Sequence, residues 1–273
     1  MIIRFNDIEP TRYPDGMLEY IPNNPISSEP IQIVASIRSF DSLMGLTQVV
    51  QWCRSQTNKP EIHLQLHYLI GGRMDRGVHG VNILRTVCDV INSLNFDSIE
   101  VIWPHSSSTI DLLDAKHNTY LEKLFIYNSI LQARSVFESE ELDICLPDGG
   151  AVKRWYNDHA DILGQDNVSW KQGHIGVQEC SKHRNPITAE LSGFGCPYNV
   201  RENCLIVDDI CDGGGTFSGL AVELRKAGAK LIGLAVYHGL LFKDIPEGID
   251  FVYTTNSARN HHPWTNLHVE KVV

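Results

Sequence analysis

The residues best suited to chemistry follow a short apolar run near residue 204. Cys204 to Val207 has the composition of a buried strand, and two carboxylates, Asp208 and Asp209, come directly after it. The chain then continues into a loop and the start of a helix with Asp212, Gly213, Gly214, Gly215 and Thr216. Backbone N–H groups of such a loop bind anions, and paired carboxylates accept hydrogen bonds from a vicinal diol. The order of these groups favours a ribose 5-phosphate site over an ordinary strand-to-helix turn.

A second predicted strand is followed by an acid, two glycines and two bases. The run from Asp143 to Pro147 predicts the strand, and the residues of interest after it are Asp148, Gly149, Gly150, Lys153 and Arg154. Glycine lets the backbone approach a diphosphate closely, and a carboxylate oxygen is a ligand that Mg²⁺ prefers. This segment therefore predicts a site for a diphosphate and its metal ion.

Two further bases, Lys182 and Arg184, precede a long segment without periodicity. That segment, Asn185 to Asn199, holds two prolines and two glycines. A long irregular loop in a compact domain is usually functional or disordered. We interpret the two bases as groups that reach a substrate from the root of a loop, and the alternative is an exposed basic turn.

The first half of the chain carries a charged loop after a predicted strand. An alternating run from Ile62 to Leu66 predicts the strand, and beyond it lie Arg73, Asp75 and Arg76. Guanidinium groups bind phosphates through paired N–H donors, so this loop suits an anion or a nucleotide. A solvated salt bridge within the loop is the alternative.

Two more segments of the first half are candidate functional sites with less specific sequence patterns. His105 follows a predicted strand, Ile99 to Trp103, where an imidazole can bind a metal or a phosphate or can be structural. Between Arg12 and Ile21 a Pro-Asp-Gly turn joins two runs with aromatic residues, which predicts a hairpin-like loop. Tyr13 and Asp15 lie at that turn.

Composition limits the classes of function. The chain has 273 residues, enough for one large or two medium domains, and its 42% hydrophobic and 21% charged residues are typical of a soluble globular protein. A formal net charge of −10 argues against nucleic acid as the main partner. No apolar run reaches membrane-spanning length, so we expect no membrane partner. Seven cysteines without a C-x-x-C pair indicate reduced thiols, which predicts a cytoplasmic location.

In their order along the chain, these segments resemble those of the ribose-phosphate diphosphokinases (PRPP synthetases), which share the type I phosphoribosyltransferase fold. The glycine loop resembles the family's ribose-5-phosphate loop, and the segment from Asp148 to Arg154 resembles its pyrophosphate loop. The Arg73–Arg76 segment is similar to its ATP-phosphate motif and the Arg12–Ile21 segment to its adenine loop. Met74 stands where the family usually has Gln, and Met17 where it has Glu. The resemblance covers roughly residues 12 to 257.

The resemblance implies an α/β fold of two similar domains, each a mainly parallel sheet flanked by helices. We place the domains at residues 1–128, on the ATP side, and 129–273, on the ribose-phosphate side. The implied enzyme transfers the β,γ-diphosphate of ATP to the C1 hydroxyl of a ribose 5-phosphate unit and releases AMP.

The resemblance also implies a role for each motif. Lys182 and Arg184 would be catalytic, and Mg²⁺ would be held by His105 and Asp148. The residues implied for ATP are Tyr13, Asp15, Arg73, Asp75, Arg76 and His105. The diphosphate loop would consist of Asp148, Gly149, Gly150, Lys153 and Arg154, and the ribose-phosphate site of Asp208, Asp209, Asp212, Gly213, Gly214, Gly215 and Thr216. The adenine loop usually serves a neighbouring subunit, which implies a homo-oligomer.

One departure concerns the acceptor. The family's loop has Thr where this chain has Gly213, so a hydroxyl donor to a terminal phosphate is missing. A donor of this kind is worth about 1.5–3 kcal/mol, and its loss favours a phosphate diester over a monoester. A subgroup from phage NAD-salvage pathways, which pyrophosphorylates ADP-ribose, resembles this form. ADP-ribose is therefore the alternative acceptor, and a non-catalytic regulatory homologue is the alternative class.

Overall fold

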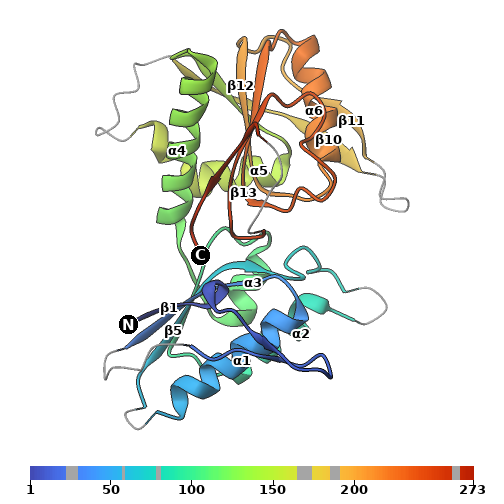
Figure 1. Ribbon diagram of the computed structural model, residues 1–273. Coiled ribbons are helices and arrows are strands. Elements are labelled where there is room, and N and C mark those ends of the chain that lie inside the picture. The colour runs from blue at the N-terminus through green and yellow to red at the C-terminus, as the bar shows by residue number, and fades with distance from the viewer. Residues whose placement is uncertain (23–29, 57–58, 78–80, 165–173, 185–190, 260–264) are drawn as a thin grey trace. The chain divides into compact units, whose positions relative to one another are not determined.

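The alternation of strands and helices along the chain produces two parallel β-sheets, each in its own unit of the computed structural model (Figure 1). The first unit comprises Met1–Asn118 with Lys271–Val273, and the second comprises Thr119–Glu270. The structure describes residues 1–22, 30–56, 59–77, 81–164, 174–184, 191–259 and 265–273. A boundary at residue 128 would cut helix α4 (Thr119–Phe137), whose buried face packs on the second sheet, so the division precedes this helix.

The sheet of the first unit contains five parallel strands in the order β1-β4-β5-β6-β7. Their bounds are Ile2–Arg4 for β1, Ile31–Ile37 for β4, Ile62–Leu69 for β5, Ser98–Val101 for β6 and Lys116–His117 for β7. The helices are α1 (Phe40–Arg54), α2 (Ile83–Ser93) and α3 (Ser107–Leu113). Side-chain oxygens of Ser39, Asn82 and Ser106 cap their N-termini, as expected from the preference of Ser and Asn for that position.

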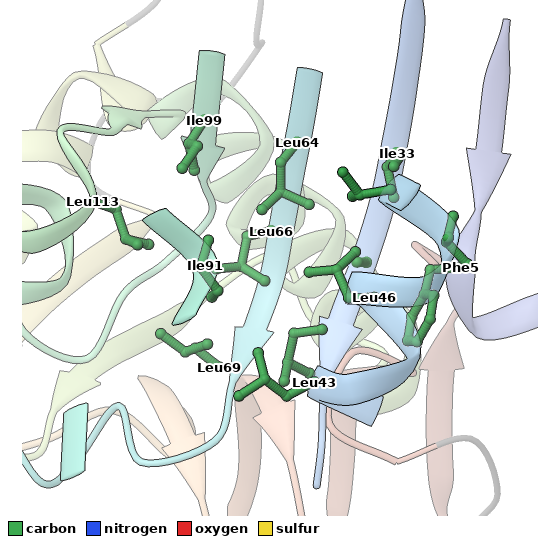
Figure 2. Close-up of a cluster of buried hydrophobic side chains, with 14 of the residues drawn as sticks. Phe5, Ile33, Leu43, Leu46, Leu64, Leu66, Leu69, Ile91, Ile99 and Leu113 are labelled. Carbon is green, nitrogen blue, oxygen red and sulfur yellow. The ribbon is translucent and has the colours of Figure 1, made fainter. Parts of the chain in front are cut away.

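The core of this unit lies between its sheet and helices α1 and α2. Figure 2 shows Leu43 and Leu46 of α1 and Ile91 of α2 facing the strand residues Leu64 and Leu66. These side chains are all buried. The 3.6-residue period of each helix and the strongly apolar strands therefore place the helices on the sheet, as the family resemblance implies.

The predicted hairpin is present at the N-terminal end of the first unit. Strands β2 (Thr11–Arg12) and β3 (Leu18–Glu19) pair antiparallel after a short 3-10 helix, η1 (Phe5–Asp7). Gln48 of α1 accepts a hydrogen bond from the Tyr20 N–H at 2.8 Å and donates one to the Leu18 carbonyl at 3.0 Å. The hairpin is thereby fixed to α1.

The second unit has a six-stranded parallel sheet in the order β15-β14-β13-β12-β8-β9. The strands are β8 (Leu142–Leu146), β9 (Ile175–Glu179), β12 (Asn203–Cys211), β13 (Leu231–Gly239), β14 (Phe251–Thr255) and β15 (Leu267–Glu270). Helices α4 and α6 (Gly215–Lys226) lie on opposite faces of the sheet (Figure 1). A separate antiparallel hairpin is formed by β10 (Ser181–Arg184) and β11 (Leu191–Gly195).

Successive side chains of the strands point to opposite faces of the second sheet and pack against helices on both faces. Leu234 of β13 packs in one core with Phe217 and Leu220 of α6. On the other face, the rings of Tyr237 and Phe125 of α4 have their centroids 5.2 Å apart. Both faces are therefore covered, which explains the nearly continuous apolar character of these strands. No helix within the described residues is long and apolar enough to cross a membrane.

Candidate active site

In the parallel sheet of the second unit, the chain adds strands outward on opposite sides of the β8–β12 pair. The candidate site lies where this strand order reverses. β8 leads through the short helix α5 (Gly149–Arg154) to β9 on one side, whereas β12 leads through α6 to β13 on the other. In open parallel sheets, ligands bind outside the carboxyl ends of the strands at such a reversal. The two motifs that the sequence predicted for diphosphate and ribose phosphate therefore meet at one edge.

Asp208 and Asp209 lie within β12 and not after it, because β12 continues beside β13 as far as Cys211. Arg154 joins the two carboxylates, and its Nη2 lies 2.9 Å from one oxygen of each. Asp208 is 8% exposed and Asp209 is 1% exposed. The pair is therefore a nearly buried site with one shared guanidinium group, which Arg154 supplies.

The electrostatics of this pair favour the neutral form of the Asp208 carboxyl group. Burial raises the pKa of Asp208 well above its ordinary range, and the neighbouring charge of Asp209 raises it further. Arg154 acts in the opposite direction. Burial tends to lower the pKa of Arg154, but the charges of Asp209 and Asp208 outweigh burial and raise it. The guanidinium group thus stays charged, and the two aspartates offer oxygen atoms to the hydroxyl groups of a diol.

The predicted diphosphate loop begins with a helical turn. Asp148 is the N-cap of α5, and its Oδ1 accepts a hydrogen bond from the Ala151 N–H at 2.9 Å. Its Oδ2 lies 2.5 Å from Nζ of Lys182. Burial alone would raise the pKa of Asp148, but the hydrogen bonds from Lys182 and Ala151 and the nearby positive charges lower it overall. Asp148 is therefore an ionised oxygen donor with a lysine already beside it.

Lys182 lies on strand β10 of a hairpin, and residues 185–190 of the predicted loop lie outside the described part of the chain. Leu191–Gly195, which the sequence analysis placed in that loop, forms β11 and pairs with β10. Phe194 of β11 lies against Gly219 of α6, where a Cβ atom would come within 2.2 Å of the Phe194 ring. The hairpin is therefore seated on the helix that follows the glycine loop. Arg184 lies on β10, but its side chain is outside the described part of the chain.

The glycine loop has the conformation that an anion site requires. Gly214 is the N-cap of α6 with a φ of +78°, a left-handed value that favours glycine, and its carbonyl accepts hydrogen bonds from the N–H groups of Phe217 and Ser218. Gly213 is exposed, and nothing lies within 4 Å of where its Cβ would be. Gly215 and Thr216 form the first turn of the helix. A phosphate can therefore approach the backbone N–H groups here.

Four of the six predicted ATP residues line a pocket of about 600 Å³ in the first unit. Arg73, Asp75, Arg76 and His105 all line it, together with Met74, Val81, Ile83 and Ser106. Ser106 donates a hydrogen bond to Asp75 Oδ2 at 2.8 Å, which ties the Arg-x-Asp-Arg loop to the N-terminus of α3. A pocket with two arginines and a histidine is suited to a polyanion.

Tyr13 and Asp15 do not line this pocket. Tyr13 is 44% exposed, and its hydroxyl donates to Glu19 Oε2 at 2.9 Å, which raises the pKa of the phenol. Asp15 Oδ1 accepts a hydrogen bond from the Met17 N–H within the turn. The hairpin thus presents an exposed ring that is not part of this pocket.

The donor atoms at the site fit Mg²⁺ only in a form that includes substrate oxygens. Among the described residues, no group of three His, Cys, Asp or Glu side chains is placed to hold a metal ion alone. Mg²⁺ is commonly held by one or two carboxylates together with substrate phosphates and water. The ionised carboxylate of Asp148 is suited to that mode. His105 lies in the other unit and lines the anion pocket there.

One supporting interaction could not be found from the sequence. His159 Nε2 and Glu122 Oε2 form a buried contact of 2.8 Å between α4 and a π-helical turn, Trp155–His159, that continues α5. That turn follows Arg154 directly, so the contact helps to fix where the guanidinium group lies. The two residues are 37 positions apart, and no local pattern connects them.

Comparisons with known proteins were made for sequence and for structure. No family model matches the chain. It is 27% identical over 273 residues to the ribose-phosphate pyrophosphokinase of Mycoplasmopsis pulmonis, a match that covers 95% of this chain and 79% of the relative. It is 23% identical over 262 residues to that of Pyrococcus furiosus, covering 92% and 86% of the two chains.

A solved structure gives the same result for the fold. The phosphoribosylpyrophosphate synthetase of Mycobacterium smegmatis superimposes with a TM-score of 0.66 at 19% identity and covers 97% of this chain and 85% of its own. The predicted fold of two parallel α/β units is confirmed, and so is the predicted family resemblance.

Proposed function

From the relationship of this chain to the ribose-phosphate pyrophosphokinases, which extends over nearly its whole length, we propose that it is a diphosphokinase. The enzyme transfers the β,γ-diphosphate of ATP to the C1 hydroxyl of a ribose 5-phosphate unit. The hydroxyl oxygen attacks the β-phosphorus in line, the bond to the α,β-bridging oxygen breaks, and AMP leaves. Such chemistry depends mostly on positioning and charge stabilisation.

The observation that carries this proposal is the juxtaposition at the edge of the second sheet. Paired aspartates on β12, joined by Arg154, lie at the strand end that leads into the glycine loop of α6. In the proposal, Asp208 and Asp209 orient the ribose hydroxyls while the loop binds the 5-phosphate. Asp212 belongs to the same loop.

Each of the remaining motifs has a role in the same proposal. Arg73 and Arg76 bind the phosphates of ATP in their pocket, and Lys182 and Arg184 stabilise the transferred diphosphate. Lys153 is exposed on α5, where it can add positive charge for the diphosphate. Mg²⁺, when bound through Asp148 and substrate oxygens, neutralises charge on the diphosphate. His105 contributes on the ATP side, and the enzyme works as a homo-oligomer.

The proposal also concerns the identity of the acceptor. The open space at Gly213 supports an acceptor whose 5-phosphate is esterified, with ADP-ribose as the form to test beside ribose 5-phosphate. A panel of ribose 5-phosphate compounds, incubated with ATP and Mg²⁺ and analysed by mass spectrometry, tests it. A product heavier than the acceptor by one diphosphoryl group supports the proposal for that acceptor. If neither ATP nor any acceptor of the panel were consumed, the proposal would be rejected.

Gly213→Thr should shift kcat/KM toward ribose 5-phosphate relative to ADP-ribose. The threonine Cβ meets no atom within 4 Å, so the new hydroxyl can donate to a terminal phosphate without displacing the loop. A charge-assisted bond of about 1.5–3 kcal/mol corresponds to a change of about 10- to 150-fold in the ratio. Gly213→Ala is the matched control, because it adds the Cβ without the donor. A ratio that is the same in both variants would show that the hydroxyl has no role.

Asp148→Ala should raise the Mg²⁺ concentration needed for half-maximal activity. The substitution removes an ionised oxygen donor, and it also frees Lys182 from its partner. Titration of turnover with Mg²⁺ measures the effect, and EDTA should abolish turnover in the unmodified protein. Asp161→Ala, which removes an exposed carboxylate paired with Lys123, controls for the loss of one charge. If the Mg²⁺ dependence of Asp148→Ala and of His105→Ala both matched that of the unmodified protein, neither residue would be a ligand.

A further inference from the structure

The segment that follows β13 runs directly beside the glycine loop. The Leu240 N–H donates to the Cys211 carbonyl at 2.8 Å, and the Phe242 N–H donates to the Asp212 carbonyl at 3.3 Å. Further along, a Cβ on Gly214 would lie 2.9 Å from the Pro246 side chain. Residues 240–246 therefore form one wall of the loop that we assign to the 5-phosphate.

The backbone of this wall is held in a conformation that turns Phe242 outward. Leu241 has a φ of +47°, which is unusual for a non-glycine residue, and its side chain is fully buried. Two contacts from the Arg259 Nη1 atom, to the Leu240 carbonyl at 3.4 Å and the Leu241 carbonyl at 3.3 Å, support the turn. Phe242 is 68% exposed as a result. Unfavourable backbone conformations of this kind persist where the surroundings enforce them, often at ligand sites.

An exposed aromatic ring beside a phosphate loop is suited to a larger acceptor that carries a planar group. Ribose 5-phosphate ends at its phosphate, which the loop itself binds. A group esterified to that phosphate would extend past the loop, and residues 240–246 lie directly beside the loop. Lys243, next to Phe242, is also exposed and supplies a positive charge for a second phosphate.

On this basis we propose that Phe242 stacks on a planar base that is joined through the 5-phosphate of the acceptor. The inference rests on the proposed function, and it makes Phe242 a specificity-determining residue for an acceptor of the nucleoside diphosphate-ribose class. Aromatic side chains stack on bases of any sequence because every base has a π-face. The ring thus favours the nucleotide acceptor and leaves the binding of a simple ribose phosphate unchanged.

The experiment compares ADP-ribose with ribose 5-phosphate, by turnover and by calorimetric binding without ATP. In Phe242→Ala, the affinity and kcat/KM for ADP-ribose should fall by about 5- to 150-fold, the range of one base–aromatic stack. Both values for ribose 5-phosphate should stay within twofold of the unmodified protein. Phe242→Trp should retain ADP-ribose binding. Tyr198→Ala is the matched control, because Tyr198 is another aromatic residue and is 97% exposed. It lies far from the glycine loop along α6, since the nearby Val200 N–H donates to the Ala227 carbonyl at the other end of that helix.

The outcomes separate this inference from the proposed function. Equal affinity of Phe242→Ala and the unmodified protein for ADP-ribose would overturn the stacking role, and so would an equal loss for both acceptors. Failure of the unmodified protein to bind ADP-ribose would also overturn it, while turnover of ribose 5-phosphate would leave the diphosphokinase function intact. Binding of ADP-ribose that depends on Phe242 would support the inference even if no diphosphate were transferred.

Discussion

Lys182→Ala is expected to lower kcat by about 100-fold or more while the KM values for ATP and the acceptor change little. Lys182 lies on the β10–β11 hairpin with its Nζ 2.5 Å from Asp148 Oδ2. To act on a diphosphate, the ammonium group must leave this carboxylate, so its contact with substrate forms late. Interactions made mainly in the transition state lower kcat when they are removed, and the loss of one preorganised donor costs about 100- to 1,000-fold.

Steady-state kinetics at saturating Mg²⁺ measure this effect, because Asp148 also loses its cation in the variant. Lys226→Ala is the matched control, since Lys226 is an exposed lysine of the same unit that pairs with Glu223 on α6. Its kcat should stay close to that of the unmodified protein. Retention of more than half of kcat in Lys182→Ala would remove Lys182 from the catalytic groups.

Arg154→Ala should lower the free energy of unfolding by about 3–5 kcal/mol, the usual cost of removing one partner from a buried ion pair. Arg154 is the cation that joins Asp208 and Asp209, and both carboxyl groups are almost fully buried. Without it, two acidic groups remain in a site of low polarity. Urea unfolding at pH 8 measures the loss, and the ribose-phosphate site should fail at the same time.

The pH dependence of this loss has a definite sign. In the folded state the pKa of Asp208 is already above its unfolded value, and the removal of Arg154 raises it further because Arg154 acts to lower it. The penalty for the buried charge is therefore greatest at high pH and is relieved as pH falls and the carboxyl group takes up a proton. The stability deficit of Arg154→Ala should be smaller at pH 5.5 than at pH 8. Lys153→Ala, an exposed neighbour, should change stability by less than about 0.5 kcal/mol at either pH.

Local sequence patterns predicted several strands and the residues of the candidate site, whereas the fold of two α/β units was implied by the family resemblance. Apolar runs indicated the strands, and the polar residues after β8 and before α6 indicated the site, because parallel strands carry ligand groups at their carboxyl ends. The Arg-x-Asp-Arg loop and His105 do share one pocket.

Contacts between distant parts of the chain could not be predicted in this way. Arg154 is 54 residues from Asp208, and no pattern in either segment indicates that they meet. Strand β11 was missed because its residues, Leu191–Gly195, include two glycines. Their strand conformation depends on pairing with β10 and on the contact of Phe194 with α6. Phe242 gave no signal at all, since its place beside the glycine loop depends on the parallel pairing of β12 with β13.

The most direct test of the account is the identity of the nucleotide that leaves ATP. The protein is incubated with ATP, Mg²⁺ and either ribose 5-phosphate or ADP-ribose, and the products are quantified by ³¹P NMR. For at least one acceptor, AMP is expected in an amount equal to that of a product with a diphosphate on C1. Release of ADP with a singly phosphorylated acceptor, or no consumption of ATP with either acceptor, would contradict it.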